Sequence, residues 1–221
     1  MKIKKVIHSN RRTIALQVCD DTSLIIRAPF YTSNQTISEV ILKHNKWLEN
    51  KKKEIMIRNL KYPMKKFVNG ELFFFLGNNY PLVLVKEQRE QLSLSEGKFL
   101  LRENLNHPED AFITWYKKMA NKTVTQQVEV LAGKYKFEYN KISITHARKQ
   151  WGSCSHSGNL NFSWRLMMTP LMVINYIIIH ELVHLEIKNH SKNFWNKVEK
   201  YMPSYKTQKE WLKKNGHSLK L

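Results

Sequence analysis

Several features that mark particular protein classes are scarce in this chain of 221 residues. Glycine (7) and proline (6) are few, which excludes a low-complexity linker. The two cysteines, Cys19 and Cys154, lie far apart in the sequence, which excludes a disulfide framework and suits a reducing, cytoplasmic environment. The N-terminal charges of MKIKKVIHSNRR are not followed by an apolar run, so a secretory signal is not expected.

Acidic residues are also scarce. Asp and Glu number 18 against 37 Lys and Arg, a formal net charge of +19. Residues 133–221 hold 15 basic and 5 acidic residues, so the excess is spread along the chain and is not confined to a basic tail. A field of this sign attracts nucleic acid, anionic membrane surfaces or acidic proteins. Nucleic acid is therefore a possible partner, and the alternative is that the lysines are simply solvated.

One apolar run, residues 166–185 (LMMTPLMVINYIIIHELVHL), is about as long as a membrane span. It contains Pro170, Asn175 and Glu181 together with two histidines, and these polar groups would be costly in lipid. We therefore interpret it as a helix buried inside a globular protein and expect no membrane partner.

The first half of the chain reads as a β-rich N-terminal region, residues 1–107, with one helix. Thr36 or Ser38 can cap that helix, whose apolar stripe continues to about Leu60. The first three strands are expected to form an antiparallel meander, and the other four to form two hairpins, around Gly77–Asn79 and around Glu96-Gly97. The expected strands cover residues 3–7, 13–18, 23–28, 71–76, 80–85, 91–95 and 98–102.

The second half, residues 108–221, reads as a separate core or as the continuation of one domain. Pro108 can open a helix from 109 to about 132, and Gly133 is placed to stop it. Extended segments are expected at 142–146, 149–151 and 159–164. Three helices should follow, from Pro170 to about Ile187, from 192 to 201 after a cap at Ser191, and from about 205 to 215 before Gly216. Strands followed by helices, without regular alternation, predict an α+β fold.

Residues 180–184 form an H-E-x-x-H motif inside the most apolar segment. Residues four apart share one face of a helix, so the imidazoles of His180 and His184 can bind the same metal ion. Glu181 lies beside that face and can reach an activated water molecule without being a ligand itself. Ionisable groups buried on an apolar helix need partners, and a metal ion supplies one. The alternative is that both histidines are core residues with ordinary hydrogen bonds.

A catalytic zinc ion usually has three protein ligands and a water molecule, so a third ligand is required. His190 follows His184 by six residues, which would place it about 9 Å further along a straight helix. We therefore expect the helix to break at Lys188-Asn189, with Asn189 left-handed, so that a turn returns His190 to the metal. The other candidates for the third ligand are Glu186, His156 and His146.

These residues predict a zinc metallopeptidase with one Zn²⁺ per chain and a protein or peptide substrate. The metal would acidify water and polarise the scissile carbonyl, while Glu181 takes the proton and passes it to the leaving amine. The oxyanion needs a further donor. Three basic residues near the motif are candidates for such transition-state or substrate contacts, and each could equally be solvated or ion-paired: Arg148, His156 and Arg165.

The segment before the metal helix, residues 148–168, contains an alternating strand that could offer its edge to an extended peptide. Its aromatic side chains are equally well explained as core. Cys154, a lone cysteine, is interpreted as a small buried residue. The alternating residues are Leu160, Phe162 and Trp164.

Four motifs of this half carry a family resemblance: W-G-S-C-S at 151–155, N-L-N-F-S-W-R-L at 159–166, H-E-L-V-H-L at 180–185 and N-H-S-K-N-F-W at 189–195. Together they resemble the YgjP-like zinc metallopeptidases, also called the DUF45 or WLM-related group. The resemblance implies a zincin-like, SprT-like minimal metallopeptidase core in a cytoplasmic protein. It carries the three histidines over as metal ligands and Glu181 as the catalytic base. The relation to SprT-like enzymes suggests substrates bound to DNA.

Two classes of function compete on this sequence. The first is a zinc peptidase, and the second is a DNA-associated protein whose metal site is structural or vestigial. Structural zinc sites usually close with four protein ligands, often cysteines. Only three ligands can be named here, next to a glutamate placed for catalysis, which favours the enzyme. Both combine in a protease that acts on DNA-bound proteins, and a regulatory or toxin-like protease with one partner is a third possibility.

Overall fold

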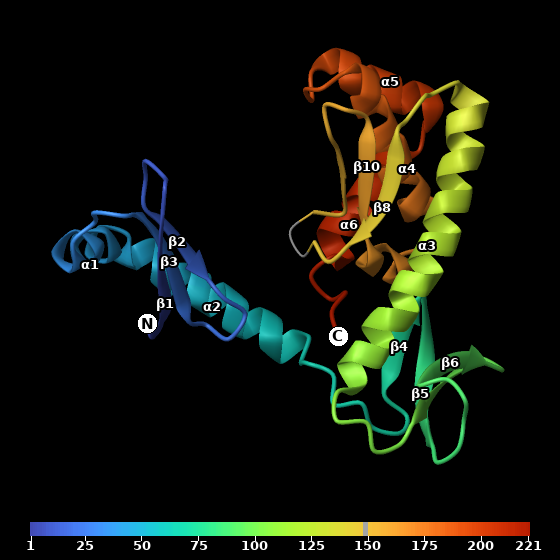
Figure 1. Cartoon of the computed structure of the whole chain (residues 1–221), viewed down its shortest axis with the longest axis horizontal. Coiled ribbons are helices and arrows are strands. Elements are labelled where there is room, and N and C mark those ends of the chain that lie inside the picture. The colour runs from blue at the N-terminus through green and yellow to red at the C-terminus, as the bar shows by residue number, and fades with distance from the viewer. Residues whose placement is uncertain (148–149) are drawn as a thin grey trace. The chain divides into compact units, whose positions relative to one another are not determined.

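The computed structural model of the chain describes residues 1–147 and 150–221 (Figure 1). It divides into two compact units, an N-terminal unit of Met1–Met64 and a C-terminal unit of Lys65–Leu221. The boundary expected between residues 107 and 108 lies inside the C-terminal unit, where a strand is followed by a helix. Both units contain helices and strands, and the predicted α+β class is confirmed. Among the described helices, none has the length and apolarity that a bilayer span requires.

The N-terminal unit contains one three-stranded sheet in the order β1-β3-β2. β1 runs parallel to β3 and β2 runs antiparallel to it, so the predicted antiparallel meander is wrong. β3 takes the centre because its side chains are the most apolar of the three strands, whereas β1 carries two lysines that an edge position leaves in water. The strands are β1 (Ile3–Ser9), β2 (Ala15–Val18) and β3 (Leu24–Pro29).

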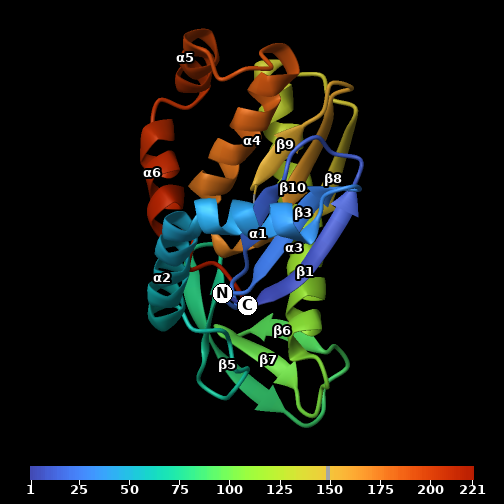
Figure 2. The ribbon, with the colours of Figure 1, turned by 90° about the vertical axis from the view of Figure 1, so that its left-hand side faces the viewer.

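Two helices lie against this sheet (Figure 2), where the sequence predicts one helix. Ser33, not Thr36 or Ser38, is the N-cap, and its hydroxyl accepts the backbone N–H of Thr36 at 3.1 Å. His44 separates the two helices. No proline or glycine lies at this break, which is why the apolar periodicity reads as one continuous helix. The helices are α1 (Asn34–Lys43) and α2 (Asn45–Lys61).

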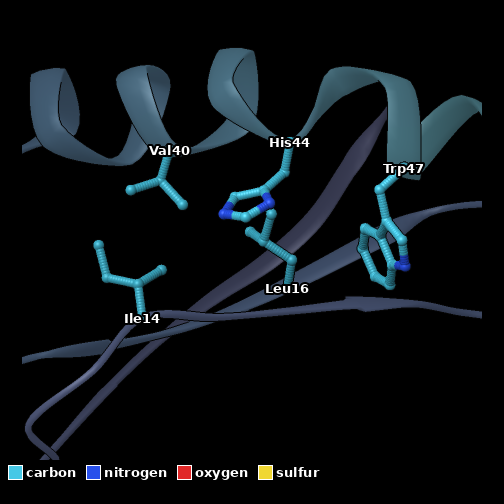
Figure 3. Close-up of a pocket in the computed structure, with 5 residues that line it drawn as sticks. All are labelled: Ile14, Leu16, Val40, His44 and Trp47. Carbon is cyan, nitrogen blue, oxygen red and sulfur yellow. The ribbon is translucent and has the colours of Figure 1, made fainter.

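A groove of about 350 Å³ lies between β2 and the two helices (Figure 3). Val40 and His44 point from the helical side toward the strand side, and the Trp47 ring stands at one end. Trp47 remains 47% exposed, so the groove is open to solvent. Its lining consists of Ile14, Leu16, Val40, His44 and Trp47.

The C-terminal unit begins with a four-stranded sheet in the order β4-β5-β7-β6. The two predicted hairpins are confirmed. In the first hairpin, however, the turn residues are Leu76 and Gly77, both left-handed, rather than residues 77–79. A Cβ on Gly77 would lie 2.7 Å from Cγ of Pro170, so this turn packs against the N-cap of the helix that carries His180 and His184. The strands are β4 (Leu72–Phe75), β5 (Asn78–Val85), β6 (Leu92–Ser95) and β7 (Lys98–Arg102).

The long helix α3 (Pro108–Tyr135) contacts both β6 and β8, so it links the two sheets of this unit (Figure 1). Gly133 lies inside the helix, so its predicted role as the stop is wrong. The helix ends at Lys136, which adopts the left-handed conformation at φ 58°. The additional turn is stabilised because the Tyr135 hydroxyl donates to the carbonyl of Tyr201 at 2.9 Å.

A second sheet precedes the last three helices and has the order β8-β10-β9. β10 carries the alternating aromatic pattern but lies in the centre of this sheet, so the expectation that it offers an edge is wrong. The edge strand beside the metal helix is β9. The strand predicted at 149–151 lies partly outside the described residues. The strands are β8 (Lys141–Thr145), β9 (Gly152–Cys154) and β10 (Asn159–Ser163).

The last three helices occur where the sequence predicts them, after a short 3₁₀ helix, η1 (Trp164–Met168). α4 contacts β9, α3, α5 and α6, so it lies at the centre of the C-terminal unit (Figure 2). A single apolar core extends from the four-stranded sheet through α3 to α4 and α5. The helices are α4 (Leu171–Glu186), α5 (Lys192–Tyr201) and α6 (Tyr205–Asn215).

Candidate metal centre

Helix α4 carries His180, Glu181 and His184. Nine of its residues are buried, so its neighbours fix it on several sides. His180 and His184 lie one turn apart, and their ring centroids are 4.8 Å apart. The packed helix therefore holds the two imidazoles on one face.

The turn after α4 brings His190 back to this face. The helix ends at Glu186 because Ile187 adopts an extended conformation, at φ −121° and ψ 102°. Asn189 does not have a positive φ, so the predicted left-handed asparagine is wrong. Its side-chain oxygen instead accepts the backbone N–H of Ser191 at 3.2 Å, which tightens the turn before α5.

The Nε2 atoms of the three histidines surround one point. Nε2 of His190 lies 3.0 Å from that of His180 and 3.2 Å from that of His184. Nδ1 of His184 lies 2.9 Å from the carbonyl oxygen of Ile187. A carbonyl only accepts, so this Nδ1 carries the proton and the Nε2 of the neutral ring presents a lone pair to the group. The three-histidine group can hold a metal ion.

The ring of Phe194 in α5 closes one side of this group. Its centroid lies 4.9, 4.5 and 4.8 Å from those of His180, His184 and His190, and the side chain is completely buried. Trp195, the next residue, stacks on His190 at 5.7 Å. An apolar wall of this kind keeps water from competing on that side and strengthens electrostatic interactions within the site.

Burial sets the protonation states of the site. Together with the nearby charges of the other two histidines and Lys209, burial lowers the pKa of His180 to about 3. Burial also lowers the pKa of His184, against the opposing effect of its bond to the Ile187 carbonyl. Both imidazoles are therefore neutral at pH 7, the state that binds metals. Burial raises the pKa of Glu181 to about 8, and a bound cation would oppose this shift by favouring the carboxylate.

Gly152 in β9 lies directly against Glu181. A Cβ at this position would be 2.7 Å from both Cγ and Oε1 of Glu181. The edge strand can therefore approach α4 this closely only because residue 152 has no side chain. The sequence shows the glycine but not this contact, which depends on how β9 packs on the helix.

The sequence also predicted Arg148, His156 and Arg165 as site residues, and the two that the structure describes do not belong to the histidine group. Arg148 lies outside the described residues. His156 lies in the exposed turn between β9 and β10. Arg165 donates from Nη2 to the carbonyl of Leu219 at 2.7 Å and lies over the ring of Trp151 at 4.8 Å. Its contacts therefore hold the C-terminal segment against η1.

The rival candidates for the third ligand have other partners. The Glu186 carboxylate forms an ion pair with Lys197. Nδ1 of His146 accepts the indole N–H of Trp164 at 3.2 Å. Neither belongs to the group that can hold a metal among the described residues.

Two residues of the neighbourhood carry no signal in the sequence. Tyr176, one turn before His180, has its ring 6.1 Å from the His180 ring, and burial raises its pKa to about 12, so it stays a neutral hydroxyl. Lys209 in α6 lies over the ring of Trp195 at 4.0 Å. Lys209 is one of many lysines in the sequence, and only the packing of α6 on α5 distinguishes it.

Comparisons with known proteins give similar solved structures and one matching family. Similar solved structures include the metallopeptidase zymogen of Pyrococcus abyssi abylysin, at 23% identity and a TM-score of 0.38, over 41% of this chain and 93% of that chain. Another is Wss1 from Saccharomyces cerevisiae, at 19% identity and a TM-score of 0.34, over 49% of this chain and 87% of that chain. No curated protein matches the sequence. The YgjP-like metallopeptidase domain family matches residues 12–215, and the chain belongs to this family.

Proposed function

We propose that the chain is a zinc-dependent peptidase with one Zn²⁺ held by His180, His184 and His190. The observation that carries this proposal is the convergence of three Nε2 atoms beside a buried glutamate. Tetrahedral ligands at about 2.0–2.1 Å from zinc lie about 3.3 Å from one another. Two of the three separations between these nitrogens, at 3.0 and 3.2 Å, are close to that value, and all three ligand atoms lie within 4.8 Å of one another. Three ligands leave a fourth position for water or substrate.

Glu181 is the proposed general base. When bound, zinc acidifies water and polarises the scissile carbonyl. The Glu181 carboxylate accepts the proton of the attacking water and then delivers it to the leaving amine. The close packing of Gly152 limits the positions that this carboxylate can adopt, which favours a single productive geometry.

The edge strand β9 is the proposed site for the substrate backbone. It pairs with β10 on one side and has no second strand partner among the described residues. It also contacts α4, the helix that carries His180 and His184. An extended peptide that adds to this edge would place its backbone next to the metal centre.

Replacing Glu181 with Gln tests this function. We expect Glu181→Gln to keep one zinc per chain and to lower peptide hydrolysis by at least about 10³-fold, because the amide cannot take the proton. Glu186→Gln, on the same helix but paired with Lys197, is the matched control and should retain activity. Hydrolysis that survives in the Glu181 variant would exclude it as the base. The inactive variant can also trap substrates for identification by mass spectrometry.

A second candidate function is association with nucleic acid, favoured by the charge of the N-terminal unit. Residues 1–64 hold 13 Lys and Arg but 5 Asp and Glu, a net charge of +8. In this proposal the unit brings the peptidase to proteins bound on DNA, or the protein binds DNA and its metal site is structural. DNA affinity should then fall steeply with salt and survive Glu181→Gln, whereas proteolysis should not. DNA binding with no hydrolysis in the wild type would favour the structural site.

A further inference from the structure

Lys209 of α6 lies next to the proposed metal centre. Its ammonium group is 4.0 Å from the centroid of the Trp195 ring. A cation over an aromatic face is attracted by the ring quadrupole, which restricts where the flexible lysine stem points. The side chain is nevertheless exposed, so its charge is accessible from solvent.

The Trp195 ring connects Lys209 to the histidines. It stacks on His190 with a centroid distance of 5.7 Å and lies 5.8 Å from the His180 ring. The Trp195 ring also stacks on the Tyr205 ring of α6, with a centroid distance of 5.5 Å and an interplanar angle of 18°. Trp195 is therefore held by Tyr205 of α6 as well as by the histidines. The Trp195 ring lies between the Lys209 ammonium and the rings of His180 and His190.

Two other lysines on α5 and α6 form ion pairs, whereas Lys209 forms none with a described residue. Lys197 of α5 pairs with Glu186, and Lys206 of α6 pairs with Glu199 at 2.9 Å. Within residues 1–147 and 150–221, no carboxylate lies within ion-pair distance of Lys209. A positive charge fixed beside a site built from neutral imidazoles has no anion to balance it until a ligand binds.

We propose that Lys209 and Trp195 form a carboxylate-binding subsite beside the metal, which selects peptides with a negative charge close to the scissile bond. This inference rests on the proposed peptidase function. The Trp195 ring separates the ammonium from the histidines, so Lys209 reaches a group further along the substrate than the atoms at the metal. The ammonium lies within about 10 Å of the His190 ring, and an extended peptide advances about 3.3 Å per residue, which puts the selected carboxylate up to about three residues from the cleaved bond. An acidic side chain and a free C-terminus both supply it.

Hydroxamates that bind through the metal test the subsite without any peptide. The probes are dicarboxylic monohydroxamates with two, three or four methylene groups, each compared with its neutral terminal amide, on zinc-loaded protein. In the wild type we expect the best carboxylate to bind about fivefold more tightly than its amide, the size of an exposed ion pair. Lys209→Gln should lose this preference, and Lys206→Gln, which removes the same charge from the same helix, should keep it. Equal binding of carboxylate and amide by the wild type for all three lengths would overturn the subsite but not the metal centre. Failure of every hydroxamate to bind would overturn both.

Peptide substrates distinguish the two sources of the carboxylate. A peptide with Glu near the cleaved bond is compared with its Gln counterpart, each with a free or an amidated C-terminus. We expect Lys209→Gln to raise KM about fivefold for the charged peptides with kcat little changed. If amidation of the C-terminus removes the preference for the charged peptide, the subsite binds the C-terminal carboxylate. If replacement of Glu by Gln removes it, the subsite binds the acidic side chain. An equal fall in kcat for all four peptides would overturn the subsite, because Lys209 would then act on the oxyanion.

Discussion

The two units of the molecule differ in how completely they bury their apolar side chains. In the C-terminal unit, one continuous core includes both sheets and α4, the helix that carries His180 and His184. The core of the N-terminal unit has five buried residues. Leu42 and Leu60 of its helices remain 73% and 84% exposed. The candidate metal centre therefore lies in the more completely packed unit, whereas the helices of the N-terminal unit leave apolar side chains exposed.

The largest effect on zinc binding is expected from the loss of His190, the proposed third ligand. His190→Ala should weaken zinc binding by roughly 3 kcal/mol, or more than about 100-fold, since four ligands together contribute about 10–16 kcal/mol. Competition with a chromophoric chelator measures this affinity. His156→Ala, a histidine in the exposed turn between β9 and β10, is the control and should bind zinc as the wild type does. Wild-type affinity in the His190 variant would remove it from the ligand set.

A pair of core substitutions compares the units directly. Leu48 is 2% exposed in the small core of the N-terminal unit, and Leu182 is fully buried in α4. Leu48→Ala should destabilise its unit by about 3 kcal/mol and leave zinc affinity unchanged, because every ligand lies in the other unit. Leu182→Ala should lose a similar amount of stability and weaken zinc binding as well. Hydrogen exchange measured by mass spectrometry locates the loss of protection. A weaker zinc site in the Leu48 variant would show that the units are coupled.

Part of this organisation could be predicted from the sequence. The apolar run after Pro170 predicted α4, and the cap at Ser191 and the stop at Gly216 predicted α5 and α6. The spacing of His180 and His184 predicted their shared face, because helix geometry is local. The two hairpins were also predictable, since Glu96-Gly97 and Gly77 supply left-handed turn residues. Features that depend on neighbours along the chain are those that sequence patterns specify best.

Tertiary contacts account for the features that could not be predicted. The order β1-β3-β2 follows from which strand has the most apolar side chains, and not from the turns that join the strands. Gly133 does not end α3, because a contact between Tyr135 and Tyr201 stabilises a further turn. Gly152 and Lys209 belong to the site only through the packing of β9 and α6 on other elements. No local pattern in the sequence distinguishes them from other glycines and lysines.

A smaller effect on activity is expected at Gly152 of β9, which packs against Glu181, the proposed base. Gly152→Ala places a methyl group where the Glu181 carboxylate lies, and this carboxylate ends a flexible side chain that can move away. We expect the protein to fold and keep zinc, with kcat lowered about 10- to 100-fold by displacement of the base. Ser153→Ala, in the same strand, is the matched control because the Ser153 side chain contacts Asn161. Unchanged kcat in the Gly152 variant would show that the position of Glu181 is not critical.

The smallest effect is expected at Arg165, a candidate substrate contact whose guanidinium donates hydrogen bonds to the C-terminal segment and lies over the Trp151 ring. Its Nε and Nη2 atoms donate to the carbonyl of Leu219 at 3.1 and 2.7 Å, and Leu219 is 1% exposed. Arg165→Met keeps much of the apolar stem but leaves this buried acceptor unsatisfied, which should cost about 1–2 kcal/mol in urea denaturation. We expect kcat/KM for peptides to stay within about threefold of the wild type, because the guanidinium is already engaged away from the histidines. A fall in kcat well beyond this range, with stability unchanged, would instead return Arg165 to the transition state and make the C-terminal segment part of the catalytic centre.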